Sequence, residues 1–306
     1  MRDGGLTVRV GVGWSPLDRG AVGTPRFFSA IEVLEEIGYD SIWLSDTATG
    51  AGASPLPVLA AVAARTEHLK LGTSILVVPP RAPVLLAKEL ATLDVLSGGR
   101  FLPAFGIGID EPVELAALGI AREERVARLE EAVAVINALW AGEPVTYRGR
   151  FTSLEHVTLA PRPARRSLEI WLSGSSPPAL RRVGRIAEGW LASRITPAEF
   201  AGAVAAIQEA AAEAGRAIPD DHYGMIVPVA RSDAEADRLR SFGRYNRPGL
   251  ELRDIVGVGA DGVRSLLQRF RAAGATKFVL VPLAPDPVPF LRELKTEVVD
   301  AFETAR

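Results

Sequence analysis

Residues that could carry chemistry stand where short apolar runs give way to loops. The most informative is the turn Gly174–Pro178, which follows the run Leu168–Ser173 and leads into a helix that starts with two prolines. Proline at the first helical position wastes no hydrogen bond, and the free N–H groups of a helix start, together with the helix dipole, attract anions. Small residues let a ligand approach the backbone. The turn predicts a phosphate site, with an ordinary capped helix as the alternative.

The ends of four earlier apolar runs supply an aromatic ring, carboxylates, hydroxyls and glycines. These residues are Trp14, Asp46, Thr73, Ser74, Ile75, Gly106, Ile107, Gly108, Ile109, Asp110 and Glu111. In a barrel of parallel strands such ends meet at one mouth, so we expect them to line a common site. Asp46 is explained equally well as a loop cap, and Trp14 as a core residue. Gly106 and Gly108 do not begin a G-x-G-x-x-G dinucleotide fingerprint, because its third glycine would fall on Glu111.

Composition argues against several classes of function. The 306 residues include no cysteine, which excludes thiol catalysis, disulfides and cysteine metal sites and is compatible with a reducing cytoplasm. The formal net charge of −2 gives no electrostatic reason to bind nucleic acid or an anionic membrane. His68, His156 and His222 have no second ligand at metal-binding spacing. Met1–Gly5 lacks an apolar signal core and no apolar run is long enough to span a membrane, so we expect a cytoplasmic protein.

The elements that must position these residues follow from an alternation of short apolar runs with stretches of helical period. Strands are expected at Val8–Val12, Ser41–Leu44, Leu71–Val78, Phe101–Phe105, Leu168–Leu172, Trp190–Ala192, Tyr223–Val229 and Phe278–Val281. Helices are expected at Thr24–Ile37, Pro55–Arg65, Pro83–Leu96, Arg122–Trp140, Pro177–Ile186, Pro197–Ala214, Asp233–Ser241, Gly259–Ala273 and Pro289–Ala301. Several of these helices begin at or just after proline, which suits the first helical turn.

This alternation predicts an α/β fold with a parallel sheet. Runs such as Ile75–Val78 are apolar on both faces, as are parallel strands covered by helices. Eight strand–helix units fit a (β/α)8 TIM barrel better than an open doubly wound sheet, and we expect residues 1–306 to form one such domain. Gly142–Arg166, extended or a hairpin, and Phe242–Arg253 are expected to be loop insertions, which often act as lids.

Several short motifs also occur in the order and spacing of a known family. They are Gly38–Asp46, Leu71–Ile75 with Pro79 and Arg81, Leu86–Lys88, Ala91–Asp94, Leu96–Arg100, Arg128–Glu131, Leu139–Trp140, Pro161–Pro163, Gly174–Arg182 and Gly189–Trp190. On these residues the chain resembles the bacterial luciferase-like flavin and deazaflavin oxidoreductases over most of residues 8–195. The C-terminal third is less diagnostic.

The resemblance implies a TIM barrel that binds a flavin or deazaflavin at its C-terminal mouth. The residues it assigns to the cofactor are Trp14, Asp46, Thr73, Ser74, Ile75, Gly106, Ile107, Gly108, Ile109, Gly174, Ser175 and Ser176. Within this set, Gly174–Ser176 would hold the phosphate, and the Ser74–Ile75 peptide, often cis in the family, would back the ring. Gly106–Glu111 would run along the polar ring edge, where backbone N–H groups can stabilise a developing negative charge.

Proton transfer is where the chain departs from the family. Glu111 matches an acidic residue that some deazaflavin members use as proton donor. Many of those members carry Asp-His where this chain has Asp46-Thr47, and threonine cannot act as an acid or base near neutral pH. Asp46 and Glu111 therefore remain the catalytic candidates, with Asp46 orienting or protonating the substrate and Trp14 walling the pocket.

On this basis we expect an oxidoreductase that uses coenzyme F420, an 8-hydroxy-5-deazaflavin, to pass a hydride to or from an unidentified small organic substrate. The first alternative is an FMN-dependent monooxygenase that uses reduced flavin and O₂. The second is a non-catalytic barrel that binds a phosphorylated ligand. A homodimer is expected by analogy with the family alone.

Overall fold

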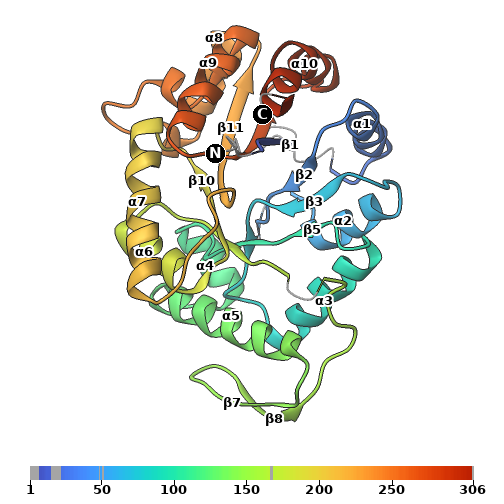
Figure 1. Cartoon of the computed structure of the whole chain (residues 1–306), viewed down its shortest axis with the longest axis vertical. Coiled ribbons are helices and arrows are strands. Elements are labelled where there is room, and N and C mark those ends of the chain that lie inside the picture. The colour runs from blue at the N-terminus through green and yellow to red at the C-terminus, as the bar shows by residue number, and fades with distance from the viewer. Residues whose placement is uncertain (1–6, 15–21, 48, 50–51, 166–167, 305–306) are drawn as a thin grey trace, which may run out of the picture.

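The computed structural model describes residues 7–14, 22–47, 49, 52–165 and 168–304, and its centre is a curled parallel sheet (Figure 1). The segments of this sheet are β1 (Arg9–Gly13), β2 (Ser41–Leu44), β3 (Lys70–Thr73), β4 (Leu76–Val77), β5 (Phe101–Leu102), β6 (Ala104–Gly106), β9 (Trp171–Leu172), β10 (Gly189–Ser193), β11 (Tyr223–Ala230), β12 (Gly257–Val258) and β13 (Lys277–Pro282). A separate antiparallel hairpin consists of β7 (Val145–Arg148) and β8 (Ser153–Val157).

The sheet closes into a barrel of eight strands. The third strand is interrupted at Ser74–Ile75, between β3 and β4, and the fourth at Pro103, between β5 and β6. The order β4-β6-β9-β10-β11-β13-β1-β2-β3-β5 therefore begins and ends on the same two neighbouring strands, which pair as β3 with β5 and β4 with β6. The (β/α)8 barrel predicted from the sequence is confirmed.

Helices pack around the outside of the barrel (Figure 1). They are α1 (Pro25–Glu36), α2 (Pro55–Ala63), α3 (Pro83–Leu96), α4 (Pro112–Leu118), α5 (Arg125–Ala141), α6 (Pro177–Ile186), α7 (Pro197–Glu213), α8 (Asp233–Asp237), α9 (Gly259–Ala272), α10 (Val288–Leu294) and α11 (Asp300–Thr304). Shorter helical segments are η2 (Arg122–Glu124), η3 (Arg238–Ser241), η4 (Gly243–Tyr245), η5 (Leu252–Asp254) and η6 (Lys295–Val299). Seven of the described α-helices have proline in their first turn, where its missing N–H costs no bond.

The structure differs from the predicted elements in several places. The predicted strands Leu71–Val78 and Phe101–Phe105 are each interrupted, and β12 was not predicted. The strand predicted at Leu168–Leu172 is paired only over Trp171–Leu172, and the helix predicted at Asp233–Ser241 changes to a 3₁₀ turn after Asp237. Helix α4 was not predicted, because seven residues are too few to show a helical period. The predicted insertion Gly142–Arg166 contains the β7–β8 hairpin.

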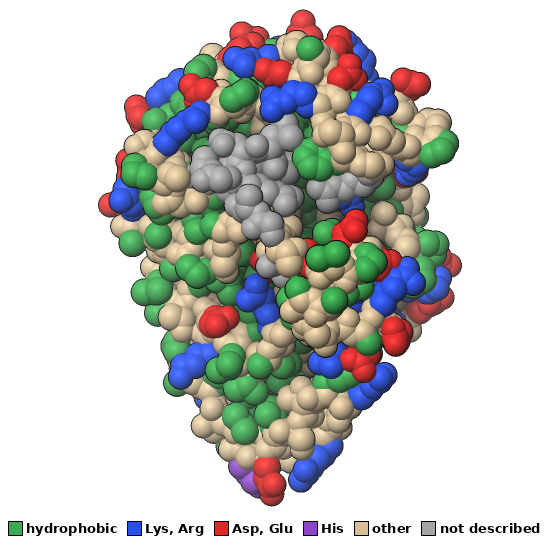
Figure 2. Space-filling model, turned by 180° about the vertical axis from the view of Figure 1, so that it is seen from behind, with side chains coloured by type: hydrophobic (Ala, Val, Ile, Leu, Met, Phe, Trp, Pro, Cys, Tyr) green, Lys and Arg blue, Asp and Glu red, His purple; other side chains and the backbone are tan. Residues whose placement is uncertain are grey.

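Buried aromatic side chains fill the barrel and the layer between sheet and helices. Trp43, Trp140, Trp171 and Trp190 are all buried, as the sequence predicts. On the rear face of the molecule, Lys and Arg side chains lie interspersed with Asp and Glu (Figure 2), in keeping with 35 basic and 37 acidic residues. Among the described residues, no helix combines the length and the apolar character needed to cross a bilayer.

Candidate functional site

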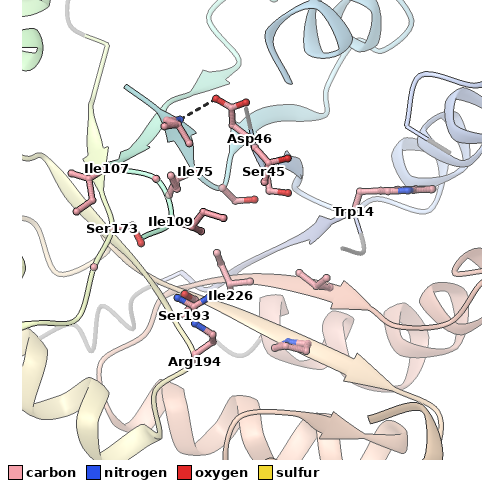
Figure 3. Close-up of a pocket in the computed structure, with 18 of the residues that line it drawn as sticks. Trp14, Ser45, Asp46, Ile75, Ile107, Ile109, Ser173, Ser193, Arg194 and Ile226 are labelled. Carbon is pink, nitrogen blue, oxygen red and sulfur yellow. Dashed lines mark hydrogen bonds between the residues drawn. The ribbon is translucent and has the colours of Figure 1, made fainter. Parts of the chain in front are cut away.

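A cavity of about 280 Å³ opens at the carboxyl ends of the strands, where most of the predicted site residues converge (Figure 3). Those that line it are Trp14, Asp46, Ser74, Ile75, Gly106, Ile107, Gly108, Ile109 and Gly174. Thr73, Glu111, Ser175 and Ser176 are not among its lining residues. This is the end of the barrel where TIM-barrel enzymes carry their active sites.

Asp46, which follows β2, forms hydrogen bonds to the third strand at its interruption and just beyond it. Its backbone N–H donates to the Ile75 carbonyl (3.0 Å), and its carboxylate Oδ2 accepts from the Val77 N–H (3.0 Å). The same oxygen accepts from the Arg81 guanidinium at 2.8 Å, and the Asp46 side chain is only 5% exposed. Oδ1 forms no hydrogen bond within the described residues, so only one of the two carboxylate oxygens is committed to the fold.

The Ser74–Ile75 segment and Gly106 form a closely fitted pair. The Ser74–Ile75 peptide bond is cis, as the resemblance implied. Because a Cβ atom on Gly106 would lie 2.5 Å from Ile75 Cδ1, any larger residue there would push the Ile75 side chain out of its place. Glycine at position 106 therefore lets the third and fourth strands approach closely beneath the cavity.

Beyond Gly106 the chain runs along the cavity with open backbone donors. In the described part of the chain, the N–H groups of Ile107, Gly108 and Ile109 form no hydrogen bond with protein atoms. Unpaired backbone donors beside a cavity suit a ligand edge rich in oxygen or carrying negative charge. This row of N–H groups is named the donor shelf below.

The predicted phosphate turn lies at the rim, next to β10. Gly174 has a φ of +117°, which L side chains rarely adopt, and its carbonyl accepts a hydrogen bond from the Trp190 indole (2.9 Å). Ser175 and Ser176 are exposed at the start of α6, and their N–H groups bond to no described residue. Gly174 reaches the cavity, while the two serines lie just outside it.

The carboxylate that lines the cavity on this side belongs to Glu114, whereas the sequence prediction chose Glu111. Glu111 is exposed at the N-cap of α4. Glu114, three residues later, is only 3% exposed, and its Oε2 accepts a hydrogen bond from the Thr49 hydroxyl (3.2 Å). Asp110 is not among the residues that line the cavity. Its hydrogen bond and ion pair with Arg122 hold the pKa of its carboxyl group below the ordinary value.

Two further predicted residues, Trp14 and Thr73, make contacts that hold the barrel together around the cavity. Trp14 is buried, lines the cavity, and packs edge-on against Phe27 with ring centroids 4.8 Å apart. Thr73 lies inside the barrel, where its hydroxyl donates to the Ala104 carbonyl and accepts from the Ala104 N–H, both at 2.9 Å. Thr73 therefore links the third and fourth strands below the cavity.

The sequence prediction missed the residues that later strands contribute. Ser173, Ser193 and Arg194 line the cavity from the ends of β9 and β10, and Ile226 lies across it from Asp46 (Figure 3). Arg194 has a left-handed φ of +58°, which is uncommon for a residue with a side chain. Their position at strand ends was the available signal, but the motifs of this half of the chain are short.

Comparison with known protein families shows which family the chain belongs to. The family model described as luciferase-like monooxygenase matches residues 8–277. The chain belongs to this family. The F420-dependent glucose-6-phosphate dehydrogenase of Beutenbergia cavernae is 34% identical to this luciferase-like chain over 247 residues, which cover 76% of the chain and 73% of that protein. The enzyme of the same description from Microbacterium testaceum is 40% identical over 167 residues, covering 51% and 49%. The chain spans about half the length of most of the curated relatives it matches.

Solved structures show the same luciferase-like fold at low sequence identity. An F420-dependent secondary alcohol dehydrogenase, determined with an F420–acetone adduct, superimposes with a TM-score of 0.83 at 20% identity over 97% of the chain and 99% of its own. A monooxygenase from Streptomyces bottropensis superimposes with a TM-score of 0.82 at 23% identity, covering 96% and 99%. At these identities the likeness concerns the fold.

Proposed function

We propose that this protein is a coenzyme F420-dependent oxidoreductase that passes a hydride between the deazaflavin and a small organic substrate. The observation that carries the proposal is the pair of open donor sets at the barrel mouth, namely the donor shelf and the turn Gly174–Ser176. A ring with a polar edge and a phosphate on its side chain needs donors at two such places. Curated relatives described as F420-dependent, one of them 34% identical over three quarters of the chain, support the choice of coenzyme.

The residues at the mouth fit such a coenzyme. The Ser74–Ile75 segment would lie behind the ring, the donor shelf along its polar edge, and Gly174 with Ser175 and Ser176 around its phosphate. When bound, the coenzyme would supply a two-electron acceptor or donor. The protein's share is to orient the partners and to exclude water.

We assign the hydrogen bond to the substrate to Asp46, and proton donation at the polar edge of the ring to Glu114. Asp46 keeps Oδ1 for a substrate hydroxyl or carbonyl while Oδ2 is held by Val77 and Arg81. Glu114 takes the proton-donor role that the sequence prediction gave to Glu111, because, of these two glutamates, Glu114 is the one that lines the cavity. Thr47, in the place of the family's histidine, lines the cavity with a hydroxyl only.

The coenzyme proposal is tested by titrating the purified protein with F420 and, separately, with FMN, followed by fluorescence. We expect F420 to bind and FMN to bind at least tenfold more weakly. In a Ser176→Asp variant the helix keeps a good N-cap, but the carboxylate repels a phosphate at the same N–H groups. The Kd for F420 should then rise at least tenfold, and the increase should shrink in high salt.

Ser232→Asp is the matched control, because Ser232 caps α8 without lining the cavity. We expect it to change the Kd for F420 less than twofold. Binding of FMN alone would instead favour the monooxygenase function, and binding of neither would refute the assignment of the phosphate to this turn.

We also propose a cytoplasmic homodimer formed through α2 and α3. Leu85, Val95 and Leu96 are exposed on α3, with Leu85 and Leu96 more than 60% exposed. Leu85 and Leu96 border a groove that Leu56 and Pro57 of α2 also line. Large aliphatic side chains grouped on a surface favour burial against a partner. Lys88 and Glu89 in the same groove supply opposite charges that a two-fold axis can pair.

A further inference from the structure

A second cavity lies beside the barrel, between the start of α3, the helix α5 and the β7–β8 hairpin. Its volume is about 440 Å³, and it shares no described lining residue with the cavity at the barrel mouth. It is lined by residues 79–84, by Arg128 and Glu131 of α5, and by residues 151–153 of the hairpin, which lies next to α5 in Figure 1. We name this second cavity the side pocket.

Two guanidinium groups from different elements line the side pocket, and each keeps donors that are not used. Arg81 donates from Nε to the Val77 carbonyl (2.9 Å) and from Nη2 to Asp46 (2.8 Å). Arg128 is held through Nε and Nη2 by Glu124, at 3.0 and 2.9 Å. The Nη1 group of neither arginine forms a hydrogen bond with a described residue. Because the two side chains are only 28% and 29% exposed, their positions are set by these contacts.

The acidic residue of the side pocket already has its own partners. The two carboxylate oxygens of Glu131 accept hydrogen bonds from the backbone N–H groups of Arg150 and Phe151, at 2.8 to 3.1 Å. These bonds fix the tip of the hairpin over the pocket. The Arg128 guanidinium carbon lies 4.3 Å from the centre of the Phe151 ring, a cation–π contact that leaves Nη1 available. The hairpin therefore helps to hold Arg128 in the pocket.

Helix α3 begins in the same pocket without a side-chain cap. Its N-cap residue is Ala82, whose side chain has no acceptor, and the N–H groups of Val84 and Leu85 form no hydrogen bond with described residues. The positive end of the helix dipole adds to the field of the guanidinium groups. An uncapped helix start is common, so the two arginines are what distinguish this pocket.

We propose that the side pocket is a binding site for a small polyvalent oxyanion that carries phosphate or carboxylate groups. Planar guanidinium groups match the oxygens of both classes and form stronger hydrogen bonds to them than neutral donors do. A monovalent anion satisfies one guanidinium group, whereas a polyvalent anion can be shared by Arg81 and Arg128. The site is distinct from the one proposed for the coenzyme and does not depend on it.

Arg81 connects the side pocket to the barrel mouth, because the same guanidinium group pairs with Asp46. Asp46 lines the mouth cavity, so Arg81 has an anionic partner on one side and the side pocket on the other. An anion in the side pocket and the Asp46 carboxylate compete for one positive charge, and each weakens the hold of the other. Such a coupling is reciprocal, so a change at Asp46 must alter the affinity for the anion.

The site is tested by calorimetry with pyrophosphate as the probe. The start of α6 is a second place where this probe can bind, so the Ser176→Asp protein described above serves as the background. In this background we expect one site per chain, with a Kd for pyrophosphate about tenfold or more below that for acetate, because two guanidinium groups share the polyvalent anion. A parallel titration with citrate shows which of the two oxyanion classes the pocket prefers.

Two variants in the same background locate the binding. Arg128→Gln removes a guanidinium group and Ala82→Asp adds a carboxylate, and each should raise the Kd for pyrophosphate about tenfold or more. Ala82→Asp also supplies the missing N-cap of α3, so its melting temperature should not fall. The matched controls are Arg269→Gln, in the exposed pair with Asp254, and Ser232→Asp, at the N-cap of α8. Each control should change the Kd less than about twofold.

Asp46→Asn tests the coupling. Asparagine keeps an oxygen acceptor for the Val77 N–H but removes the charge that competes for Arg81, so the Kd for pyrophosphate should fall about threefold or more. An unchanged Kd in this variant would overturn the coupling. Absence of binding in the Ser176→Asp background, or equal binding by Arg128→Gln and Arg269→Gln, would overturn the site. The titration with F420 decides the coenzyme separately, so either proposal can fail without the other.

Discussion

At the scale of single residues, the position of one carboxylate decides the proposed proton chemistry. Glu114 is buried beside the donor shelf, and Thr49 holds one of its oxygens. Glu114→Gln keeps the size and the hydrogen-bonding capacity of the side chain but removes the acid. We expect kcat to fall about 100-fold or more, because general acid–base groups contribute at this scale. The measurement is single-turnover reduction of bound F420 by a substrate that the wild-type protein oxidises.

Glu111→Gln is the control for this variant. Glu111 carries the same functional group three residues earlier but is exposed at the helix start. We expect its kcat to stay within about twofold of wild type, with an unchanged Kd for F420. The reverse result, with the loss confined to Glu111→Gln, would return the role to Glu111 and leave Glu114 as a partner of Thr49 only.

At the scale of elements, the strands and most helices could be predicted from the sequence, because hydrophobic periodicity and prolines at helix starts are signals carried by each segment itself. The cis peptide at Ser74–Ile75 and the strand-to-helix turn at Gly174 are also as expected, whereas the interruption of the third strand at Ser74–Ile75 was not predicted. Helix α4 was missed, and without it the sequence could not indicate which of two glutamates faces inward. The apolar side of the cavity, formed by Ile226, Pro228, Leu239, Tyr245, Val281 and Leu283, was missed for another reason: these side chains come from two paired strands and the segment between them, and no motif marks which of their residues face inward.

The exposed groove between α2 and α3 leads to a prediction at the same scale. A Leu85→Glu, Leu96→Glu double variant places charges on both sides of the proposed dimer surface. We expect wild type to sediment as a dimer and the double variant as a monomer, because buried unpaired charges oppose association. Val113→Glu, at an exposed site on α4, should remain dimeric. A monomeric wild type, or a double variant that stays dimeric, would contradict the assignment.

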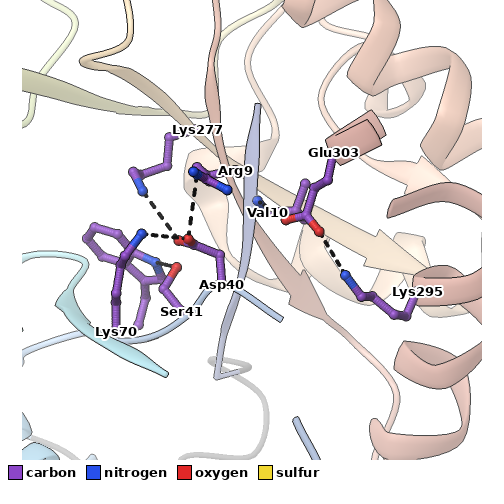
Figure 4. A network of polar contacts seen from close by, with 9 residues as sticks. Arg9, Val10, Asp40, Ser41, Lys70, Lys277, Lys295 and Glu303 are labelled. Atoms are coloured by element: carbon purple, nitrogen blue, oxygen red, sulfur yellow. Dashed lines mark hydrogen bonds and ion pairs between the residues drawn. The ribbon is translucent and has the colours of Figure 1, made fainter. Parts of the chain in front are cut away.

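At the scale of the whole molecule, the end of the barrel opposite the mouth is held by a cluster of charges (Figure 4). Asp40, just before β2, lies 2.7 Å from Lys70 and 3.5 Å from Lys277, at the start of β13. The side chains of Asp40 and Lys277 are 9% and 10% exposed. Burial alone would raise the pKa of Asp40, but Lys277 and Lys70 outweigh it and hold the pKa below its ordinary value. The pair ties β13 to the first strands of the barrel.

The lowered pKa of Asp40 sets the direction of a pH effect. A carboxyl group that is more acidic in the folded than in the unfolded protein contributes stability above its unfolded pKa, near pH 4, and that contribution is lost as the pH falls through the folded pKa. Burial lowers the pKa of Lys277, so this lysine depends on Asp40 to carry its charge inside the barrel. Removing Asp40 therefore leaves a buried cation without its anion.

We expect Asp40→Asn to lower the free energy of unfolding at pH 7 by about 3–5 kcal/mol, the usual cost of breaking a buried ion pair from one side. Urea unfolding at pH 7 and at pH 3 measures it, and the variant should lose less stability between the two pH values than wild type does. Glu155→Gln, in the exposed pair with Arg148, should cost less than about 0.5 kcal/mol. A partial recovery in Asp40→Asn, Lys277→Met would assign the loss to the stranded lysine, whereas equal losses in Asp40→Asn and Glu155→Gln would show that the cluster does not hold the barrel together.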